Sequence, residues 1–385
     1  MTEQALLSIF RSIMEAFHLK GELEDYRVVK VGNINDTYFI GTRDALGKRR
    51  DYTLQRLNHK VFQNPHQVAE NAYAITSHME QKLLSVGEKD LRRKVLHLYR
   101  KENGEFFHRS EEGDYWRVLS YVYDSRCVNV ADEEILYGTG YAFGEFQRDL
   151  SDFPAERLHH TIPDFHNTPK RFAALRESAL RNAVGRRGEV EAELAYLLSK
   201  EGYISLLEDL HREGELPLRV VHNDTKCNNV MFDAETRTPL AVIDLDTVMP
   251  GYAAHDFGDA VRFACNTAAE DEEDLSKVSL NLQAYKKLAE GFVSPLSGIM
   301  TEKEFSTLPD GVLIITLELA SRFLKDYLDG DVYFKCRKPS HNLIRARCQI
   351  ALAKDMEEKM GEMKEILTAL SVQKNFKNCE MRQKF

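Results

Sequence analysis

Residues 221–233 read VHNDTKCNNVMFD and place one His, three Asn and two Asp beside short apolar runs. Asp224 precedes Asn229 by five positions, and the apolar run that follows reads as a strand. A second acidic cluster, AVIDLDTVMPG at 241–251, carries Asp244 at the end of another apolar run. A carboxylate on such a loop can accept a proton from an attacking hydroxyl, while an Asn oxygen and a second carboxylate suit Mg²⁺. This order is that of a kinase catalytic loop and its metal-binding Asp, so the two loops indicate phosphoryl transfer.

Two other interpretations of these loops stay open. Asn and Asp also favour ordinary turns, because their side chains bond nearby backbone. The run IDLDTV at 243–248 additionally matches the haloacid-dehalogenase phosphatase pattern, in which Asp244 would be a nucleophile. Such domains continue as alternating strands and helices, whereas the chain after Asp246 reads as mainly helical. The phosphatase pattern also leaves the 221–233 cluster unexplained.

Composition narrows the class of protein. The chain has 385 residues, which favours two domains or lobes, and its net charge of −9 argues against a generic nucleic-acid binder. No run approaches the roughly 18 consecutive apolar residues of a membrane helix, and the first twenty residues resemble an amphipathic helix and not a secretion signal. The six Cys are scattered without a CxxC pair, which favours a reducing, cytoplasmic location and no zinc or disulfide framework.

Periodicity divides the chain into two parts. We expect residues 1–123 to form an N-lobe with an antiparallel sheet and one main helix at about 65–84, where Asn64 and Pro65 mark the helix start. The expected strands are 26–31, 37–41, 52–57, 94–99 and 116–123.

Residues 124–385 are expected to form a larger, mostly helical C-lobe. Its predicted helices are 131–150, 169–184, 188–210, 277–293, 302–328 and 341–370, with three short strands inside 219–247. The fold class is therefore α+β, with two lobes arranged as in protein kinases.

The N-lobe offers a candidate nucleotide site. The loop VGNINDTY at 31–38 lies between two predicted strands, and the third strand carries Arg56 ahead of Glu70 on the next helix. A cation on that strand paired with a helix Glu holds phosphates in kinases, although Gln55 could face the nucleotide with Arg56 turned away. The segment WRVLSYVY would connect the lobes, with its backbone near Val122 bonding the adenine edge.

The combined motifs resemble the aminoglycoside-phosphotransferase superfamily of small-molecule kinases, and within it the N-acetylhexosamine 1-kinases. The resemblance covers nearly the whole chain. Beside the two acidic loops it rests on VGNINDTY, YTLQRLNHKVFQNP, DFGDAVRF, FGEFQRDL, IPDFHNTPKRF at 162–172 and ELASRFLKDYLDGDVYFK at 318–335. The Asp-Asn-Asp skeleton is shared by the wider superfamily, whereas the longer motifs are specific to the subfamily.

The resemblance implies transfer of the ATP γ-phosphoryl group to the anomeric hydroxyl of GlcNAc or GalNAc. Asp224 would be the base and His222 would brace its loop, while Asn229 and Asp244 would hold Mg²⁺. Asp246, two residues further along an extended strand, would share a side with Asp244 and bind a second metal or sugar. The residues expected at ATP are Gly32, Asn33, Asn35, Thr37, Arg56, Glu70, Tyr121 and Val122. The residues expected at the sugar are Asp224, Asp246, His166, Arg171, Arg322 and Tyr333.

Two departures from the family pattern stand out. The third strand has no evident Lys, which leaves the phosphate-holding cation open, and Cys227 lies in the catalytic loop. The acceptor is the least determined feature, because another sugar, an amino alcohol or an aminoglycoside would use the same chemistry. We expect a monomer that binds ATP and a small molecule, with no nucleic-acid or membrane partner. Asn223 and Asn228 have no role that the sequence assigns.

Overall fold

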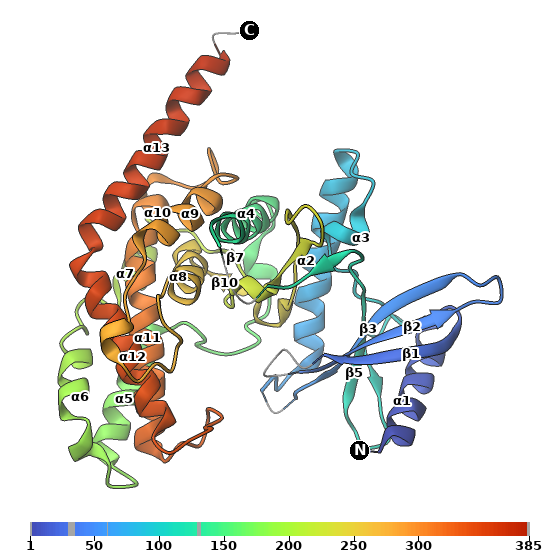
Figure 1. Ribbon diagram of the computed structural model, residues 1–385, viewed down its shortest axis with the longest axis horizontal. Coiled ribbons are helices and arrows are strands. Elements are labelled where there is room, and N and C mark those ends of the chain that lie inside the picture. The colour runs from blue at the N-terminus through green and yellow to red at the C-terminus, as the bar shows by residue number, and fades with distance from the viewer. Residues whose placement is uncertain (1, 30–34, 60, 129–131, 383–385) are drawn as a thin grey trace.

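The computed structural model describes residues 2–29, 35–59, 61–128 and 132–382, with side chains described as far as residue 371. Its N-lobe consists of a five-stranded antiparallel sheet in the order β1-β2-β3-β5-β4 with a helix on each face (Figure 1). The elements of this lobe are α1 (Glu3–Ala16), β1 (Glu22–Val29), β2 (Asp36–Arg43), β3 (Arg49–Leu57), α2 (Pro65–Ser85), α3 (Leu91–Lys94), β4 (His108–Arg109) and β5 (Tyr115–Ser120).

The two faces of the sheet bury different sets of side chains because strand residues alternate sides. One face packs Leu54 and Trp116 against Phe10 and Ile13 of α1. Thr2 begins that helix by accepting a hydrogen bond from the amide of Ala5 at 3.3 Å. The expected amphipathic N-terminal helix is therefore confirmed, and it closes the outer side of the sheet.

Helix α2 packs against the other face of the sheet and also against the C-lobe (Figure 1). One hydrophobic cluster joins Leu57 and Ile75 of the N-lobe to Leu245 and Val248 of the C-lobe. Asn71 of α2 adds polar ties, because its Nδ2 donates to the carbonyls of His159 at 2.8 Å and Val248 at 3.0 Å. The main N-lobe helix is thus fixed to both lobes.

The C-lobe is mostly helical and contains two small antiparallel sheets. β7 pairs with β10, and β6, β8 and β9 form the second sheet. The strands and helices are β6 (Ser125–Arg126), α4 (Glu133–Asp149), α5 (Thr168–Arg181), α6 (Glu191–Leu198), α7 (Leu206–Arg212), β7 (Arg219–Val221), β8 (Val230–Asp233), β9 (Pro239–Val242), β10 (Met249–Gly251), α8 (Ala253–Ala264), α9 (Leu282–Val293), α10 (Glu302–Ser306), α11 (Leu308–Asp329), α12 (His341–Glu358) and α13 (Met360–Arg382).

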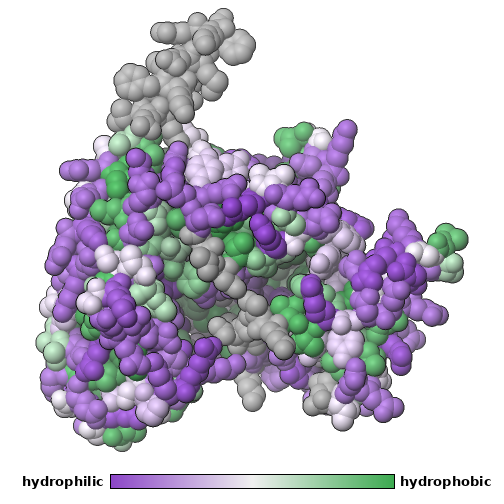
Figure 2. Space-filling view, viewed as in Figure 1, coloured by the Kyte–Doolittle hydropathy of each residue, from purple (hydrophilic) through white to green (hydrophobic). Residues whose placement is uncertain are grey.

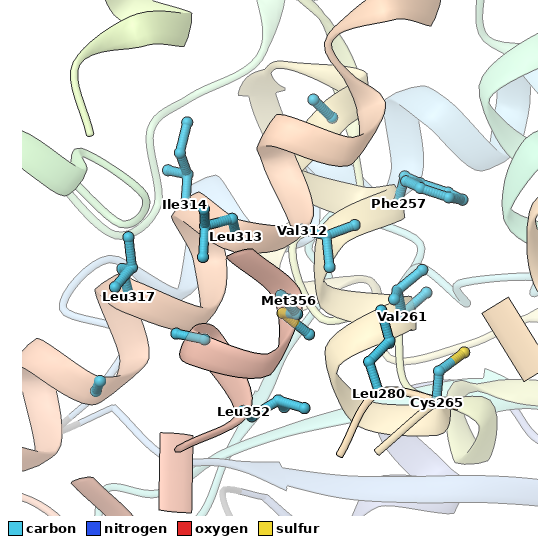
Figure 3. Close-up of a cluster of buried hydrophobic side chains, with 14 of the residues drawn as sticks. Phe257, Val261, Cys265, Leu280, Val312, Leu313, Ile314, Leu317, Leu352 and Met356 are labelled. Atoms are coloured by element: carbon cyan, nitrogen blue, oxygen red, sulfur yellow. The ribbon is translucent and has the colours of Figure 1, made fainter. Parts of the chain in front are cut away.

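The C-lobe core lies between α8, α11 and α12. Figure 3 shows Phe257 and Val261 of α8 beside Val312 of α11, with Leu352 and Met356 of α12 next to them. All five side chains are fully buried. This core fixes α8, which carries carboxylates that accept backbone amides of residues 222, 223 and 225.

Helices α4 and α9 approach so closely that their backbones touch. A Cβ on Gly140 of α4 would lie 2.1 Å from the carbonyl oxygen of Leu288, and one on Gly291 of α9 would lie 2.1 Å from that of Tyr137. Glycine is therefore required on both helices, since any side chain would push them apart.

The α+β fold class is confirmed, and four predicted elements need correction. The run 94–99 is not a regular strand: α3 ends at Lys94, and only Leu98 forms an isolated bridge, with Leu119. The segment 188–210 is not one helix but contains α6 and α7 separated by a turn. The predicted helices 302–328 and 341–370 are each divided in two, at 307 and at 359. Among the described residues, no helix is long and apolar enough to cross a bilayer.

Candidate active site

The two acidic loops begin and end on neighbouring strands. β7 pairs with β10 and β8 pairs with β9, so the loop 222–229 and the loop 243–248 emerge side by side. The amide of Ile243 donates to the carbonyl of Asn229 at 2.9 Å. Figure 2 shows that the molecule is hollowed between the two lobes, and Figure 1 places these short strands on that side of the C-lobe.

His222 joins the two loops from within. Its side chain is fully buried, and its Nε2 lies 2.9 Å from the carbonyl oxygen of Ile243. Because a carbonyl can only accept, Nε2 carries the proton, and Nδ1 is free to accept from the amide of Asp224 at 3.3 Å. Phe143 packs edge-on against the ring at 5.3 Å. His222 therefore has the geometry of a bracing residue that does not reach the solvent.

Asp256 of α8 holds the start of the catalytic loop. Its buried carboxylate accepts the amides of His222 at 2.9 Å and Asn223 at 2.8 Å, and the Nδ2 of Asn223 donates to the carbonyl of Thr247 at 2.8 Å. Asn223 has a φ of 65°, a left-handed conformation that needs such support. Asn223, to which the sequence assigns no role, thus links the two loops.

Asp224 lies at the centre of the catalytic loop with a half-buried side chain. Its Oδ1 is 2.6 Å from the Nζ of Lys226, and its Oδ2 is 3.1 Å from the Nδ2 of Asn229. Burial alone would lower the pKa of Lys226, but the charges of Asp224 and Asp259 outweigh burial and raise this pKa. The sequence-based prediction missed Lys226, although its place two residues after Asp224 was a usable signal.

Asp244 projects into the open part of the site. It has a left-handed φ of 59°, its side chain is exposed, and it forms no hydrogen bond or ion pair with the described residues. Desolvation by the surrounding protein, together with the charges of Asp246 and Asp224, raises its pKa to about 7. A cation next to this carboxylate would favour its ionised form.

The oxygens of Asn229 and Asp244 fit a Mg²⁺ site that a nucleotide completes. The Nδ2 of Asn229 is used by the carbonyl of Asp224 at 2.8 Å, which leaves the Asn229 Oδ1 for a metal. Within the described part of the chain, no three His, Cys, Asp or Glu side chains converge on one point. Mg²⁺ keeps few protein ligands and takes the remainder from phosphates and water, so two protein oxygens suit it.

Asp246 does not share a side with Asp244, which corrects the expectation drawn from an extended strand. Residues 245–247 form a 3-10 turn that buries Asp246 to 2% exposure. Its carboxylate faces the N-lobe, where it contacts Arg117 of β5 at 2.6 Å and accepts from the Nδ2 of Asn35 at 2.7 Å. The structure therefore turns Asp246 away from the open site that Asp244 faces.

The expected pair between Arg56 and Glu70 is wrong. Arg56 is held by Asp36 and Asp114, whereas the carboxylate of Glu70 lies 2.9 Å from His159. Strand alternation explains the error, since neighbouring residues on β3 face opposite sides.

Gln55 is the β3 residue that faces the site, and its Nε2 donates to the Oγ1 of Thr37 at 3.0 Å. Asn35 accepts the amide of Asn58 at 3.0 Å. Tyr121, between the lobes, packs edge-on against Phe39 at 5.1 Å, and Val122 is buried. Gly32 and Asn33 lie outside the described residues.

The four side chains expected only at the sugar gather on one wall beside the catalytic loop. His166 lies 2.9 Å from Glu318 through Nδ1 and 3.3 Å from the carbonyl oxygen of Asn223 through Nε2. Both ring nitrogens therefore face acceptors. Burial would lower the pKa of His166, but the charge of Glu318 dominates and raises it. His166 thus links Glu318 to the backbone of the loop that contains Asp224.

Arg322 and Arg171 bring positive charge to the same wall. The Arg322 guanidinium lies between the rings of Phe165 at 5.6 Å and Phe334 at 5.7 Å. Arg171 donates to the carbonyl of Phe165 at 2.9 Å and forms no ion pair with a described carboxylate. Burial and the charge of Arg322 lower its pKa. Tyr333 is 66% exposed at the edge of this wall.

Cys227 is buried to 2% exposure, and its Sγ lies 3.4 Å from the carbonyl oxygen of Val128. This burial supports the interpretation of Cys227 as a small apolar side chain and leaves it out of reach of alkylating reagents.

An antiparallel N-lobe, a helical C-lobe and a braced Asp-Asn loop beside a second Asp loop define a phosphotransferase with the kinase fold. Residues 25–290 match the model of the phosphotransferase enzyme family, and the chain belongs to that family.

Solved structures share the fold over almost the whole chain. A microcompartment-associated aminopropanol kinase has a TM-score of 0.60 at 14% identity, covering 93% of this chain and 98% of its own. A choline kinase from Cryptosporidium parvum has a TM-score of 0.56 at 13% identity, with coverage of 96% and 99%. An ethanolamine kinase from Plasmodium vivax has a TM-score of 0.54 at 13% identity, with coverage of 90% and 89%.

Proposed function

We propose that this phosphotransferase moves the γ-phosphoryl group of ATP to the anomeric C1 hydroxyl of an N-acetylhexosamine, GlcNAc or GalNAc. The acceptor oxygen forms a bond to the γ-phosphorus. The bond between the γ-phosphorus and the oxygen that bridges the β- and γ-phosphates breaks, and ADP leaves with the negative charge on that oxygen. The acceptor proton passes to Asp224. Asn229 and Asp244 would hold the Mg²⁺ that neutralises phosphate charge.

The loop geometry supports this role for Asp224. Its two oxygens are oriented by Lys226 and Asn229, which leaves the half-buried carboxylate fixed at the edge of the open site. Most of the rate enhancement would come from in-line positioning and charge neutralisation, because phosphoryl transfer asks little covalent chemistry of the protein.

The charge on the wall formed by His166, Arg171, Arg322 and Tyr333 (the basic wall) is the basis on which we choose the class of acceptor. Choline, ethanolamine and aminopropanol are cations at neutral pH, and aminoglycosides are polycations. Arg171, which has no described carboxylate partner, would repel them at the face beside Asp224, whereas Lys226 and Arg322 lie against Asp224 and Glu318. A neutral sugar can instead accept hydrogen bonds from the guanidinium groups, and the rings of Phe165 and Phe334 offer apolar surface for a sugar face or an acetamido methyl.

An anionic hydroxylated acceptor is the second candidate, and one observation favours it. Arg171 forms no ion pair with a described carboxylate, so a carboxylate or phosphate on the acceptor could pair with it bidentately. A hexuronic acid is the simplest probe of that chemistry.

An ATP-consumption screen tests both candidates. The panel is GlcNAc, GalNAc, glucose, galactose, glucuronic acid, choline and kanamycin, and phosphorus NMR of the product then locates the phosphate. We expect turnover on the N-acetylhexosamines with phosphate on C1. Turnover on glucuronic acid alone would replace the first candidate by the second, and turnover on choline or kanamycin would contradict the argument from the basic wall.

A further inference from the structure

Strand β3 supplies no cation to the site. It has no Lys, and each of its three Arg is engaged by carboxylates outside the site. These pairs are Arg49 with Asp25, Arg50 with Asp44, and Arg56 with Asp36 and Asp114. A kinase-fold site for ATP nevertheless needs fixed positive charge near the phosphates.

The neighbouring strand β5 places a buried cation beside Gln55, the β3 residue that faces the site. Arg117 of β5 lies directly opposite Gln55 in the β3–β5 pairing and is 2% exposed. Its Nε and Nη2 donate to the Oε1 of Gln55 at 3.0 and 2.7 Å, and its Nη1 lies 2.6 Å from the Oδ1 of Asp246. Gln55 thus orients the guanidinium, while Asp246 balances its charge.

The contact between Arg117 and Asp246 is incomplete as a hydrogen bond. The Oδ1 of Asp246 is buried and accepts no aligned hydrogen bond from the described residues, although Nη1 lies within 2.6 Å. Each terminal nitrogen of a guanidinium carries two N–H bonds, so Nη1 can face Asp246 with one of them and another acceptor with the second. A phosphate oxygen suits this second N–H bond, because a guanidinium can bind phosphate through several N–H bonds at once.

Fold stability alone is a weak reason to bury such a pair. Removing two charges from water costs several kcal/mol for each ion, and well-packed apolar residues often replace buried pairs without loss. Here the pair lies between the strand that would cover a nucleotide and the turn that follows Asp244. Buried charge beside a ligand site favours a binding role.

We propose that Arg117 is the phosphate-holding cation of this enzyme, with Asp246 as its counter-ion in place of a Glu on α2. This inference rests on the proposed use of ATP and extends it by naming the cation and its partner. Asp246 then balances the charge of Arg117 and holds the guanidinium in place when no nucleotide is present. The function of the missing β3 Lys is thus moved to the neighbouring strand.

The test compares binding of ATP with binding of adenosine, which has the base but no phosphate. The full chain and the variants Arg117→Lys, Arg117→Met, Arg50→Gln and Arg56→Gln are titrated calorimetrically, without acceptor. Arg117→Met should weaken ATP binding by about tenfold or more and leave adenosine binding unchanged. Arg117→Lys should recover part of the loss. Arg50→Gln and Arg56→Gln, which each remove a β3 cation outside the site, should change neither ligand.

Five outcomes separate the possibilities. Equal weakening of ATP and adenosine would assign Arg117 a purely structural role and overturn the proposal. The proposal also fails if Arg117→Lys and Arg117→Met bind ATP normally, or if Arg56→Gln alone weakens ATP binding. If the unmutated chain does not bind ATP, this inference and the proposed function fail together. ATP binding without phosphorylation of any hexosamine would leave the inference standing and contradict only the acceptor assignment.

Discussion

Lys226 and Asp224 form an ion pair of 2.6 Å inside one loop, two residues apart. The ammonium fixes one oxygen of the carboxylate, while Asn229 fixes the other at 3.1 Å. A carboxylate held in this way is prepared to receive a proton without reorganising.

Replacement of Asp224 by Asn should abolish turnover while nucleotide binding persists. The amide keeps the shape of the side chain but cannot accept the acceptor proton, so kcat should fall by about 10²- to 10⁴-fold. Steady-state kinetics and ATP titration of the same preparation measure both quantities. Near-normal kcat in Asp224→Asn would show that another group acts as the base.

Replacement of Asp256 by Asn should damage both stability and activity. The carboxylate accepts hydrogen bonds from the backbone amides of His222 and Asn223 and from the Nε2 of Gln147, the last at 2.9 Å. The side-chain amide of the variant would place its own N–H group against one of these donors. We expect a loss of about 1–3 kcal/mol in unfolding free energy, measured by urea denaturation. Glu177→Gln, exposed on α5, is the matched control and should change neither property.

Replacement of Gly140 by Ala should be strongly destabilising. The new Cβ would lie 2.1 Å from the carbonyl oxygen of Leu288, so α4 and α9 must separate, at a cost of about 3 kcal/mol or more in unfolding free energy. Gly361→Ala in α13 is the control, because a Cβ there meets no atom within 4 Å. Alanine favours helix, so that variant should be neutral or slightly stabilising. Equal urea midpoints for the two variants would contradict the close contact.

Glu208 should make stability depend on pH. Burial raises the pKa of its carboxyl group to about 7, above its usual value of 4.5. The folded state therefore binds this proton more tightly, and stability is lost as the pH rises from about 4.5 to about 7. Glu208→Gln should remove this loss and raise the unfolding free energy at pH 8 by up to about 3 kcal/mol. At pH 4 the variant and the parent should unfold at similar urea concentrations.

Mg²⁺ should compete with a proton for Asp244, whose pKa is raised to about 7. The metal needs the ionised carboxylate, so its apparent dissociation constant in the presence of ATP should rise as the pH falls below 7, by up to about tenfold per unit. Calorimetric Mg²⁺ titrations at pH 6 and pH 8 measure this change. Asp244→Asn should bind Mg²⁺ weakly at both values. Asp246→Asn should move the pH dependence to lower pH without removing it, because the charge of Asp246 helps to raise the pKa of Asp244.

The sequence predicted the fold class, because the spacing of apolar residues along each element is a local pattern. Asn64 and Pro65 correctly marked the start of α2, whose first residue is Pro65. The sequence predicted that His222 braces its loop, but a bracing role for His166 was not foreseen. His166 contacts Glu318 and the carbonyl of Asn223, and only the folded chain brings these distant segments together.

The prediction that Arg56 faces the nucleotide was wrong because of strand geometry. A shift of one residue in a strand reverses the side that a residue faces, and this separates Arg56 from Gln55. Arg117 could not be nominated without knowing that β5 lies beside β3. The run 94–99 looked like a strand, but β5 pairs on that edge with β4 through Trp116, which leaves Leu98 a single bridge.

The hydrophobic cluster around α2 has a thermodynamic consequence. Because Ile75 belongs to the same cluster as Leu245 and Val248, separating the lobes would expose apolar surface that neither lobe could cover alone. Scanning calorimetry should therefore record one endotherm for the whole chain, with the calorimetric enthalpy equal to the van't Hoff enthalpy. If the chain is cut between the lobes, neither half alone should show the melting transition of the intact chain.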